Sequence, residues 1–352
     1  MHTHKQKQAD EMNPIPTNAQ LAAAKACVLS HQNAIDTAPD AGLSDALAAH
    51  TSPDCLFQFT APFAEGTGVA AAAENFWLPL RASFAPLQRR QDMFFAGQNH
   101  VSDGAEIWVA SMGHLLGLFD RPFLGMRPTR QATMLRYAEF NLVVDGKITE
   151  STLFFDVLNL MAQVRAEALP PSTAATIVTP GPRTNDGLLF DAQPATEGDK
   201  TLKLFLRMID RLLDEDVHTT NTDLSLDWTD DMIWWGPGGI GAPYTQQRYL
   251  EQHCVPFEEG LKWGDFFGHR TEFAEGHYGG FFGWPTFDVT SLGGYIGLAP
   301  KSDKRATMRV VDLYRRQGDK LAENWNFIDH LHFLDQLGID LVARQRVLTG
   351  LD

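Results

Sequence analysis

Two aspartates occupy matching positions near the ends of two similar segments, and both residue type and setting suit proton transfer. The segments read GKITESTLFFDVLNLMAQV (146–164) and DKLAENWNFIDHLHFLDQL (319–337). A carboxyl group beside aromatic rings in a cavity has a raised pKa, because burial disfavours its charged form, and it can then act as a general acid or base. Asp156 and Asp329 are therefore the leading catalytic candidates. The alternative is that each aspartate caps the turn that follows it.

Each aspartate would share a strand face with a glutamate and with aromatic residues. Alternate residues of a strand point to the same side, which gives two matching sets: Glu150, Thr152, Phe154 and Asp156 in the first segment, and Glu323, Trp325, Phe327 and Asp329 in the second. Glu150 and Glu323 are expected to pair with Arg136 and Arg309 on the neighbouring strand. If this face lines a cavity, the same charged side chains also border the substrate.

Histidines offer further candidates, because imidazole titrates near neutral pH. His114, in SMGHLLG, and His277, in EGHYGGFFGWP, could each reach a cavity from a strand, or could be wall residues with satisfied hydrogen bonds. His330 and His332 lack a third and fourth partner at a known spacing, so no metal site is predicted. The histidines of the opening MHTH are assigned to a disordered tail.

Tryptophan is concentrated in the second half of the chain, which holds six of the eight. Core filling is one account of these large rings. A ligand cavity with tryptophan walls, which suits flat rings, is the other. Under that second account Trp234, Trp284 and Trp325 are the candidate substrate-binding residues.

The two segments belong to a longer internal repeat. A constant shift of 173 residues matches 134–164 with 307–337 at seven identical positions, among them the four charged pairs Arg136/Arg309, Lys147/Lys320, Glu150/Glu323 and Asp156/Asp329. Average composition would give about two identities over such a window. The same shift matches Glu139 with Asp312, and Phe84 with Phe257. A repeat of this length indicates a duplicated domain rather than a solenoid.

Each half begins with helical patterns and continues with alternating strands, which predicts an α+β fold with helices on one side of a curved antiparallel sheet. A Pro-, Thr- and Gly-rich stretch with no periodicity separates the halves and reads as a linker arm. The predicted division is a disordered tail (1–17), a first domain (18–165), the arm (166–198) and a second domain (199–345).

The repeated segments resemble the C-terminal signature of the SnoaL-like polyketide cyclases, in the nuclear-transport-factor-2-like superfamily. That signature runs from an "lGipPTGk" turn through a strand, "dGkIvEhW" and a further Asp to "LlxQlG". The second copy carries ENW, the Asp and QLG literally, and the first carries DGKITE and the same Asp. His114 stands where the family often writes "atHtGxf", whereas the second copy has TSLGG (290–294) and no histidine there.

The resemblance implies two tandem cone-shaped α+β barrel domains, each with a deep cavity for an apolar or polycyclic substrate. It implies proton transfer by side-chain acids and bases, with no metal and no organic cofactor. Members of the superfamily include cyclases (ester cyclases among them), isomerases, dehydratases, hydrolases and non-catalytic domains. The two hypotheses are therefore a cofactor-independent enzyme and a ligand-binding or structural protein. Relatives pair through their sheets, so a pseudo-dimer within one chain is expected, and a homodimer is possible.

Net charge, cysteine content and the lack of targeting segments restrict the kinds of partner and the location expected for this protein. A net charge of −15 argues against nucleic acid and anionic membrane surfaces. The small-molecule substrate is what the family resemblance implies. The three cysteines, Cys27, Cys55 and Cys254, form no CxxC pair and are expected to be reduced thiols. Neither a signal peptide nor a membrane span is recognised, so a cytoplasmic location is predicted.

Overall fold

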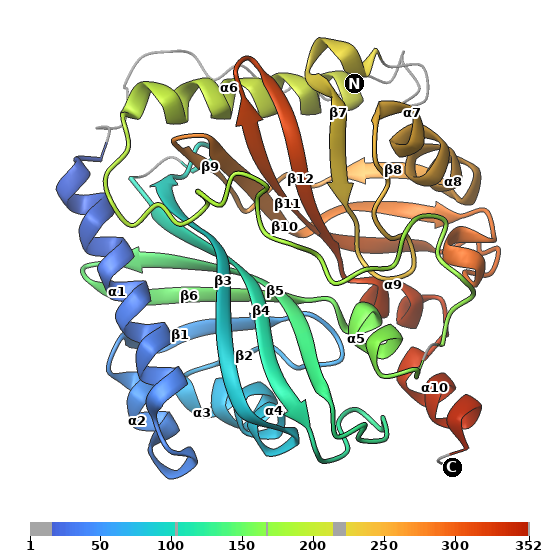
Figure 1. Ribbon diagram of the computed structural model, residues 1–352, viewed down its shortest axis with the longest axis horizontal. Helices are drawn as coiled ribbons and strands as arrows, with labels where there is room; N and C mark the ends of the chain where they lie inside the picture. Colours follow the sequence, from blue (N-terminus) through green and yellow to red (C-terminus); the bar gives the residue numbers. More distant parts are fainter. Residues whose placement is uncertain (1–15, 103–104, 167, 214–222, 351–352) are drawn as a thin grey trace.

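The fold consists of two six-stranded sheets, each with helices against one face (Figure 1). The structure is a computed structural model, and it describes residues 16–102, 105–166, 168–213 and 223–350. The elements of the first half are α1 (Asn18–Thr37), η1 (Asp40–Gly42), α2 (Leu43–Ala48), β1 (Thr51–Phe59), β2 (Gly66–Thr67), α3 (Val69–Ala72), the π-helical turn η2 (Ala73–Trp77), α4 (Leu78–Ser83), β3 (Phe84–Gln98), β4 (Ile107–Phe119), β5 (Ala132–Val144), β6 (Lys147–Phe155) and α5 (Val157–Gln163). The predicted disordered tail falls almost wholly outside the described residues.

The second half repeats this plan. Its elements are α6 (Ala195–Leu212), η4 (Leu224–Leu226), β7 (Trp228–Trp235), α7 (Gln246–Tyr249), the π-helical turn η5 (Leu250–Cys254), α8 (Val255–Gly260), β8 (Leu261–Phe266), β9 (Thr271–Glu275), β10 (Tyr278–Ser291), η6 (Tyr295–Gly297), β11 (Arg305–Gln317), β12 (Lys320–Ile328), α9 (His330–Gln336) and α10 (Leu341–Thr349).

The strand order is the same in both halves. The first sheet runs β2-β1-β6-β5-β4-β3, and the second runs β7-β12-β11-β10-β8, with β9 beside β10. The α+β cone predicted from the sequence is confirmed. One detail differs, because β1 pairs with β6, and β7 with β12, in parallel. Each first strand lies beside the last one, and the long connection between them, which holds the helices and the remaining strands of that half, allows the parallel direction.

The repeat has two offsets. β11, β12 and α9 each begin 173 residues after β5, β6 and α5 (132 to 305, 147 to 320, 157 to 330). Earlier elements are offset by 177, as η5 begins at 250 and η2 at 73, and β8 begins at 261 and β3 at 84. Phe84 therefore corresponds to Leu261, and its predicted match with Phe257 is wrong.

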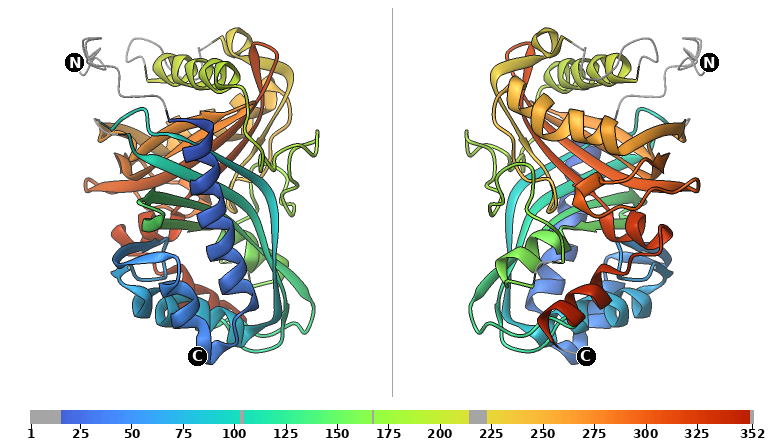
Figure 2. Two further views of the ribbon diagram at one scale, coloured as in Figure 1. Left: turned by 90° about the vertical axis from the view of Figure 1, so that its left-hand side faces the viewer. Right: turned by 90° about the vertical axis from the view of Figure 1, so that its right-hand side faces the viewer.

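The two sheets pack against each other through the faces that their own helices do not cover (Figure 2). Aromatic rings from both halves meet there, among them Phe95 with Phe273, Trp108 with Phe282, and Phe154 with Trp284 at 5.2 Å between ring centroids. Aromatic pairs add packing energy to the apolar area that they bury. Both faces of each central strand are consequently buried.

The segment between the halves lies extended across both of them (Figure 1). A parallel bridge joins Leu188 to Phe94 of β3, and an antiparallel bridge joins Ala175 to Ala242 of the second half. The indole of Trp325 donates to the carbonyl of Pro180 at 3.0 Å. These bonds satisfy backbone groups of a stretch without regular structure. The domain limits given above remain a prediction.

Buried ion pairs also connect the halves. Lys25 Nζ of α1 lies 2.7 Å from Glu275 Oε1 of β9 and donates to the carbonyls of Leu189 and Asp191. Arg270 contacts Glu150 at 2.8 Å and Glu106 at 3.1 Å. No helix in the described part of the chain is long and apolar enough to cross a membrane.

Candidate functional site

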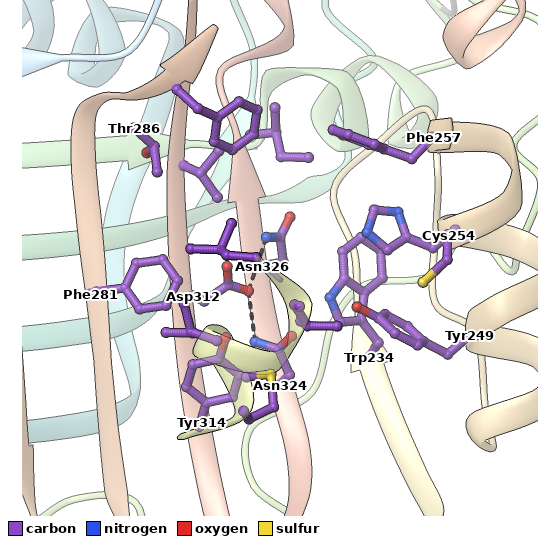
Figure 3. A pocket seen from close by; sticks show the side chains of 18 of the residues that line it. Trp234, Tyr249, Cys254, Phe257, Phe281, Thr286, Asp312, Tyr314, Asn324 and Asn326 are labelled. Atoms are coloured by element: carbon purple, nitrogen blue, oxygen red, sulfur yellow. Dashed lines mark hydrogen bonds between the residues drawn. The ribbon is translucent and has the colours of Figure 1, made fainter. Parts of the chain in front are cut away.

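A cavity of about 150 Å³ lies in the second half, between its sheet and its helices (Figure 3). Strands β10, β11 and β12 form its floor, while α6 and the run from α7 to α8 close its sides. Most of its wall is aromatic or aliphatic, and its rings belong to Trp228, Trp234, Tyr249, His253, Phe257, Trp263, Phe266, His269, Phe281, Phe287 and Tyr314.

Asp312 is the acidic group at the floor of this cavity. It lies on β11, directly across from Asn326 of β12, and Asn324 lies two residues back on the same strand. The side-chain amides of Asn324 and Asn326 donate to Asp312 Oδ1 at 2.9 and 3.0 Å. Both bonds go to Oδ1, so Oδ2 carries neither of them. Figure 3 shows the carboxyl between Phe281 on one side and Trp234 with Tyr249 on the other.

Burial raises the pKa of Asp312 to about 7, and the two amide donors lower it only in part. Neutral donors stabilise a carboxylate less than a cation does. Neither lysine nor arginine occurs among the described residues that line the cavity. The carboxyl therefore exchanges its proton near neutral pH, as a general acid or base requires.

Several polar atoms of the cavity wall lack a hydrogen-bond partner among the described residues. They are Trp228 Nε1, His253 Nδ1, Thr286 Oγ1 and Asn326 Oδ1. Buried polar groups are normally paired with protein or water, so these four atoms are unsatisfied groups of residues that line the cavity. Burial also lowers the pKa of His253, stacked on Trp234 at 4.1 Å, to about 3. His253 is therefore neutral at physiological pH.

The first half holds a different arrangement at the matching position. Glu139, the counterpart of Asp312, accepts from Arg89 at 2.9 Å, from Gln32 at 2.8 Å and from Asn141 at 2.9 Å. The Arg89 guanidinium also lies over the ring of Tyr137. Side chains of the protein itself thus occupy the space around this carboxylate and neutralise it.

Asp156 and Asp329 lie outside the aromatic cavity, at the N-termini of α5 and α9. Asp156 accepts from the backbone N–H of Asn159 at 3.0 Å, and Asp329 accepts from that of His332 at 3.2 Å. This is the capping geometry that the sequence left open as the alternative. Each carboxyl also accepts a backbone N–H of the other half, from Gly238 and Ala61 respectively.

The two caps lie close to one another between the halves. Both aspartates line a cavity of only about 10 Å³, which has room for about one water molecule. Burial raises the pKa of Asp329 to about 6 and also raises that of Asp156. We therefore propose that both aspartates stabilise the contact between the halves rather than act on a substrate.

The predicted pairing of glutamates with arginines is wrong. Arg136 lies 3.7 Å from Asp156, and Arg309 lies 3.5 Å from Asp329. Glu150 instead pairs with Arg270 of the second half. Glu323 pairs with Arg315 and accepts from the backbone N–H of Arg183. Glu150 therefore pairs across the two halves, whereas Glu323 keeps a cross-strand partner within its own sheet, but with Arg315 in place of Arg309.

The candidate histidines are also placed away from the cavity. Nδ1 of His114 lies 3.2 Å from Asp92 Oδ2, and in the sheet register His114 of β4 is opposite Arg136 of β5. His277 lies in the exposed turn between β9 and β10, 3.8 Å from Glu197. Arg309 pairs with the bulge at 284–286, so this bulge, rather than 290–294, is the counterpart of His114 in the second half.

The three tryptophans proposed as substrate contacts divide between the two faces of the second sheet. Trp234 lines the cavity. Trp325 and Trp284 lie on the opposite face, among the rings between the sheets, and the guanidinium of Arg309 covers Trp284 at 3.9 Å. His330 donates to or accepts from Tyr295 at 3.0 Å. Among the described residues there is no cluster of three potential metal ligands.

Sequence reasoning noted Asp312 as the partner of Glu139 in the repeat but did not select it. Two asparagines at alternate positions, Asn324 and Asn326, lie among the apolar residues in the second part of strand β12. Alternating amides on the strand next to an aspartate were the signal that could have identified this site. The selected residues, Glu323, Trp325 and Phe327, are the intervening ones and point to the other face.

Solved structures match parts of this chain at low sequence identity. No protein-family model matches the chain, and no curated protein matches its sequence significantly. A candidate SnoaL-like polyketide cyclase from Jannaschia sp. CCS1 shares 21% identity, with 46% of this chain and all of that one covered, at a TM-score of 0.33. An NTF2-like protein from Burkholderia thailandensis E264 shares 21% sequence identity, with 40% of this chain and 95% of that one covered, at a TM-score of 0.30. An LEH-like epoxide hydrolase from M. tuberculosis shares 15% identity, with 41% of this chain and 91% of that one covered, at a TM-score of 0.28.

Proposed function

We propose that the second half is a cofactor-independent enzyme domain in which Asp312 transfers a proton to or from a small organic substrate. The observation that carries the proposal is a carboxyl group with a pKa of about 7 at the floor of an aromatic cavity. Perturbed carboxyl groups in cavities are typical of acid–base sites. The reaction class is that of an isomerase, a dehydratase, a cyclase or a hydrolase that works through proton transfer.

The cavity supports a particular class of substrate. Its volume of about 150 Å³ is close to that of an engineered apolar cavity that binds benzene. Flat rings would stack on Trp234 or Phe281, and the described part of the lining holds neither lysine nor arginine to bind a carboxylate or phosphate. An uncharged molecule with one or two rings, or a flat portion of a larger one, therefore fits best.

The position in the first half that matches Asp312 supports the proposal that each chain has a single working site. Arg89, Gln32 and Asn141 all donate to the carboxylate of Glu139, so its oxygens already have partners from the protein itself. We propose that this half serves as the wall against which the catalytic sheet packs. The alternative function, a ligand-binding protein without catalysis, would use the same cavity and leave Asp312 without a chemical role.

A base-catalysed elimination tests the proposal without knowledge of the natural substrate. 5-Nitrobenzisoxazole is a flat uncharged molecule that opens to a coloured phenolate when a base removes its C–H proton. The protein is expected to accelerate this reaction with saturation, and the rate should rise with pH through about 7 as Asp312 ionises.

The decisive variant is Asp312→Asn, with exposed Asp303→Asn as the matched control. Loss of the base should lower kcat/KM by roughly 10²-fold or more, while the control stays at the wild-type rate. The absence of acceleration by the wild type, or an equal rate in Asp312→Asn, would refute the catalytic role. Saturable binding of the probe with no rate would leave the ligand-binding alternative in its place.

A further inference from the structure

His269 lies in the same cavity, on a segment that has no counterpart in the first half. There, β3 runs through fifteen residues without a break, with register shifts between Phe84 and Leu87 and between Gln91 and Met93. In the second half the same edge of the sheet is divided into β8 and β9, and four residues, 267–270, lie between them. Gly268 in this break has φ +98°, a conformation that favours glycine. The break thus turns His269 out of the strand pattern.

Three contacts fix the imidazole of His269. Its face stacks on Phe281 with 3.8 Å between ring centroids, and Phe266 meets it edge-on at 5.2 Å. Its Nδ1 lies 2.7 Å from Glu272 Oε1. The backbone is anchored on both sides of the histidine, because Phe267 and Arg270 donate to the carbonyls of Thr286 and Phe282 on β10. Packing and hydrogen bonds of this kind preorganise a catalytic side chain.

The carboxylate partner is itself deeply buried. The side chains of His269 and Glu272 are 3% and 2% exposed. The backbone N–H of Glu272 donates to Asn99 Oδ1 of the first half at 3.1 Å, which ties the position of this pair to the contact between the halves. A carboxylate bonded to Nδ1 sets the tautomer and leaves Nε2 to exchange a proton with a substrate. It also stabilises the positive charge that a proton on Nε2 would bring.

The sheet register relates this pair to Asp312. Phe281 of β10 pairs with Asp312 of β11 on one side and with Glu272 of β9 on the other. Neighbouring strands lie about 4.8 Å apart. Asp312 and the His269–Glu272 pair therefore flank Phe281, roughly 5–10 Å apart. A flat molecule over Phe281 would place one edge at each group.

We propose that His269 is a second catalytic residue of the site, with Glu272 as its positioning residue, and that it protonates the substrate atom on which negative charge develops while Asp312 removes a proton at the opposite edge. The inference rests on the function proposed above. In the probe reaction Asp312 takes the C–H proton, the electron pair of that bond forms the nitrile, the N–O bond breaks, and the phenolate oxygen accepts the proton from His269 Nε2. Among the described residues, the other titratable groups that line the cavity are Glu258, His253, Cys254 and the two tyrosines Tyr249 and Tyr314.

The test compares two probes that differ in their need for a proton donor. Unsubstituted 1,2-benzisoxazole releases a more basic phenolate than its 5-nitro derivative, so it depends more on protonation. His269→Gln is expected to lower kcat/KM by roughly 10²-fold for the unsubstituted probe and several-fold less for the nitro probe. Glu272→Gln, which keeps the imidazole, should show the same selectivity with a smaller loss. His253→Gln, the matched control within the cavity, should affect both probes equally.

An equal loss on both probes in His269→Gln would overturn the proposal, because a merely structural role cannot distinguish leaving groups. Should His269→Gln fail to fold by circular dichroism, the Glu272→Gln selectivity decides in the same way. The two proposals fail separately. An unchanged rate in Asp312→Asn refutes the proposed function, whereas a lost rate in Asp312→Asn together with equal probe losses in His269→Gln refutes only the role of His269.

Discussion

Replacement of Asp312 by asparagine should stabilise the protein at alkaline pH while it abolishes activity. The pKa of Asp312 is raised from 3.8 to about 7 by burial, so the folded state binds a proton more tightly than the unfolded state does. Stability contributed by this proton is fully present below pH 4 and is lost as the pH rises to about 7. Asparagine keeps an acceptor for the amides of Asn324 and Asn326 and never ionises.

The magnitude follows from the displacement of the pKa. About three pH units at 1.36 kcal/mol each correspond to a cost on the order of 4 kcal/mol for a charged Asp312 at pH 8. Urea unfolding of the wild type and Asp312→Asn between pH 4 and 9 measures it. The variant should match the wild type near pH 4 and exceed it increasingly up to pH 7–8, with a plateau beyond.

The control is Asp303→Asn, an exposed position where no such trend is expected. Groups common to both proteins, such as Asp329, cancel in the difference. A difference between wild type and Asp312→Asn that stays constant with pH would show that the carboxyl titrates normally. The electrostatic basis of the proposed site would then be refuted.

Three further perturbations test the account of the two halves. Glu139→Gln, at the matching repeat position, should destabilise the protein by on the order of 3 kcal/mol, because it leaves the buried Arg89 without its main partner. In urea unfolding, the change in unfolding free energy should have opposite signs for Glu139→Gln and Asp312→Asn. Equal signs would contradict the reasoning. Lys25→Met should lower the unfolding free energy by about 3–5 kcal/mol, because it leaves the buried carboxylate of Glu275 without its cation. The further change Glu275→Gln should restore most of this loss. Purely additive effects in the double variant would mean that the pair is not coupled. Asp329→Ala should lose about 1–2 kcal/mol of capping energy, Asp329→Asn less, and both should keep the elimination rate; a rate lost in Asp329→Asn would return this residue to the catalytic candidates.

Much of the fold was accessible from the sequence. The repeat offset of 173 residues holds for β5, β6 and α5 and their copies, because strand alternation and turn residues survive together in both segments. The parallel pairing of β1 with β6 was not accessible. The Phe84–Phe257 match also failed, because a four-residue change in offset lies between the helices and the last strands.

For the site, the sequence analysis selected residues of β12, which does line the cavity, but it selected the face of that strand that packs against the other sheet. Asp156 and Asp329 end their strands, where a carboxyl commonly caps the next helix, and a local pattern cannot tell such a cap from a cavity acid. Glu150 found its partner Arg270 in the other half, at a sequence distance where no spacing rule applies, whereas Glu323 pairs with Arg315 directly across β11 and β12 and not with the expected Arg309.

The sequence by itself determined the duplication, the α+β class and the two-residue alternation that groups Asp312 with Tyr314 and Asn324 with Asn326. It could not determine which of the two groups of residues faces a cavity. Alternation identifies a buried face when the other face meets water, but here one face packs on helices and the other on the second sheet. Only the packing of sheet on sheet decided that Trp325 and Phe327 are core residues. The same packing left Asp312 and its amides facing the open cone.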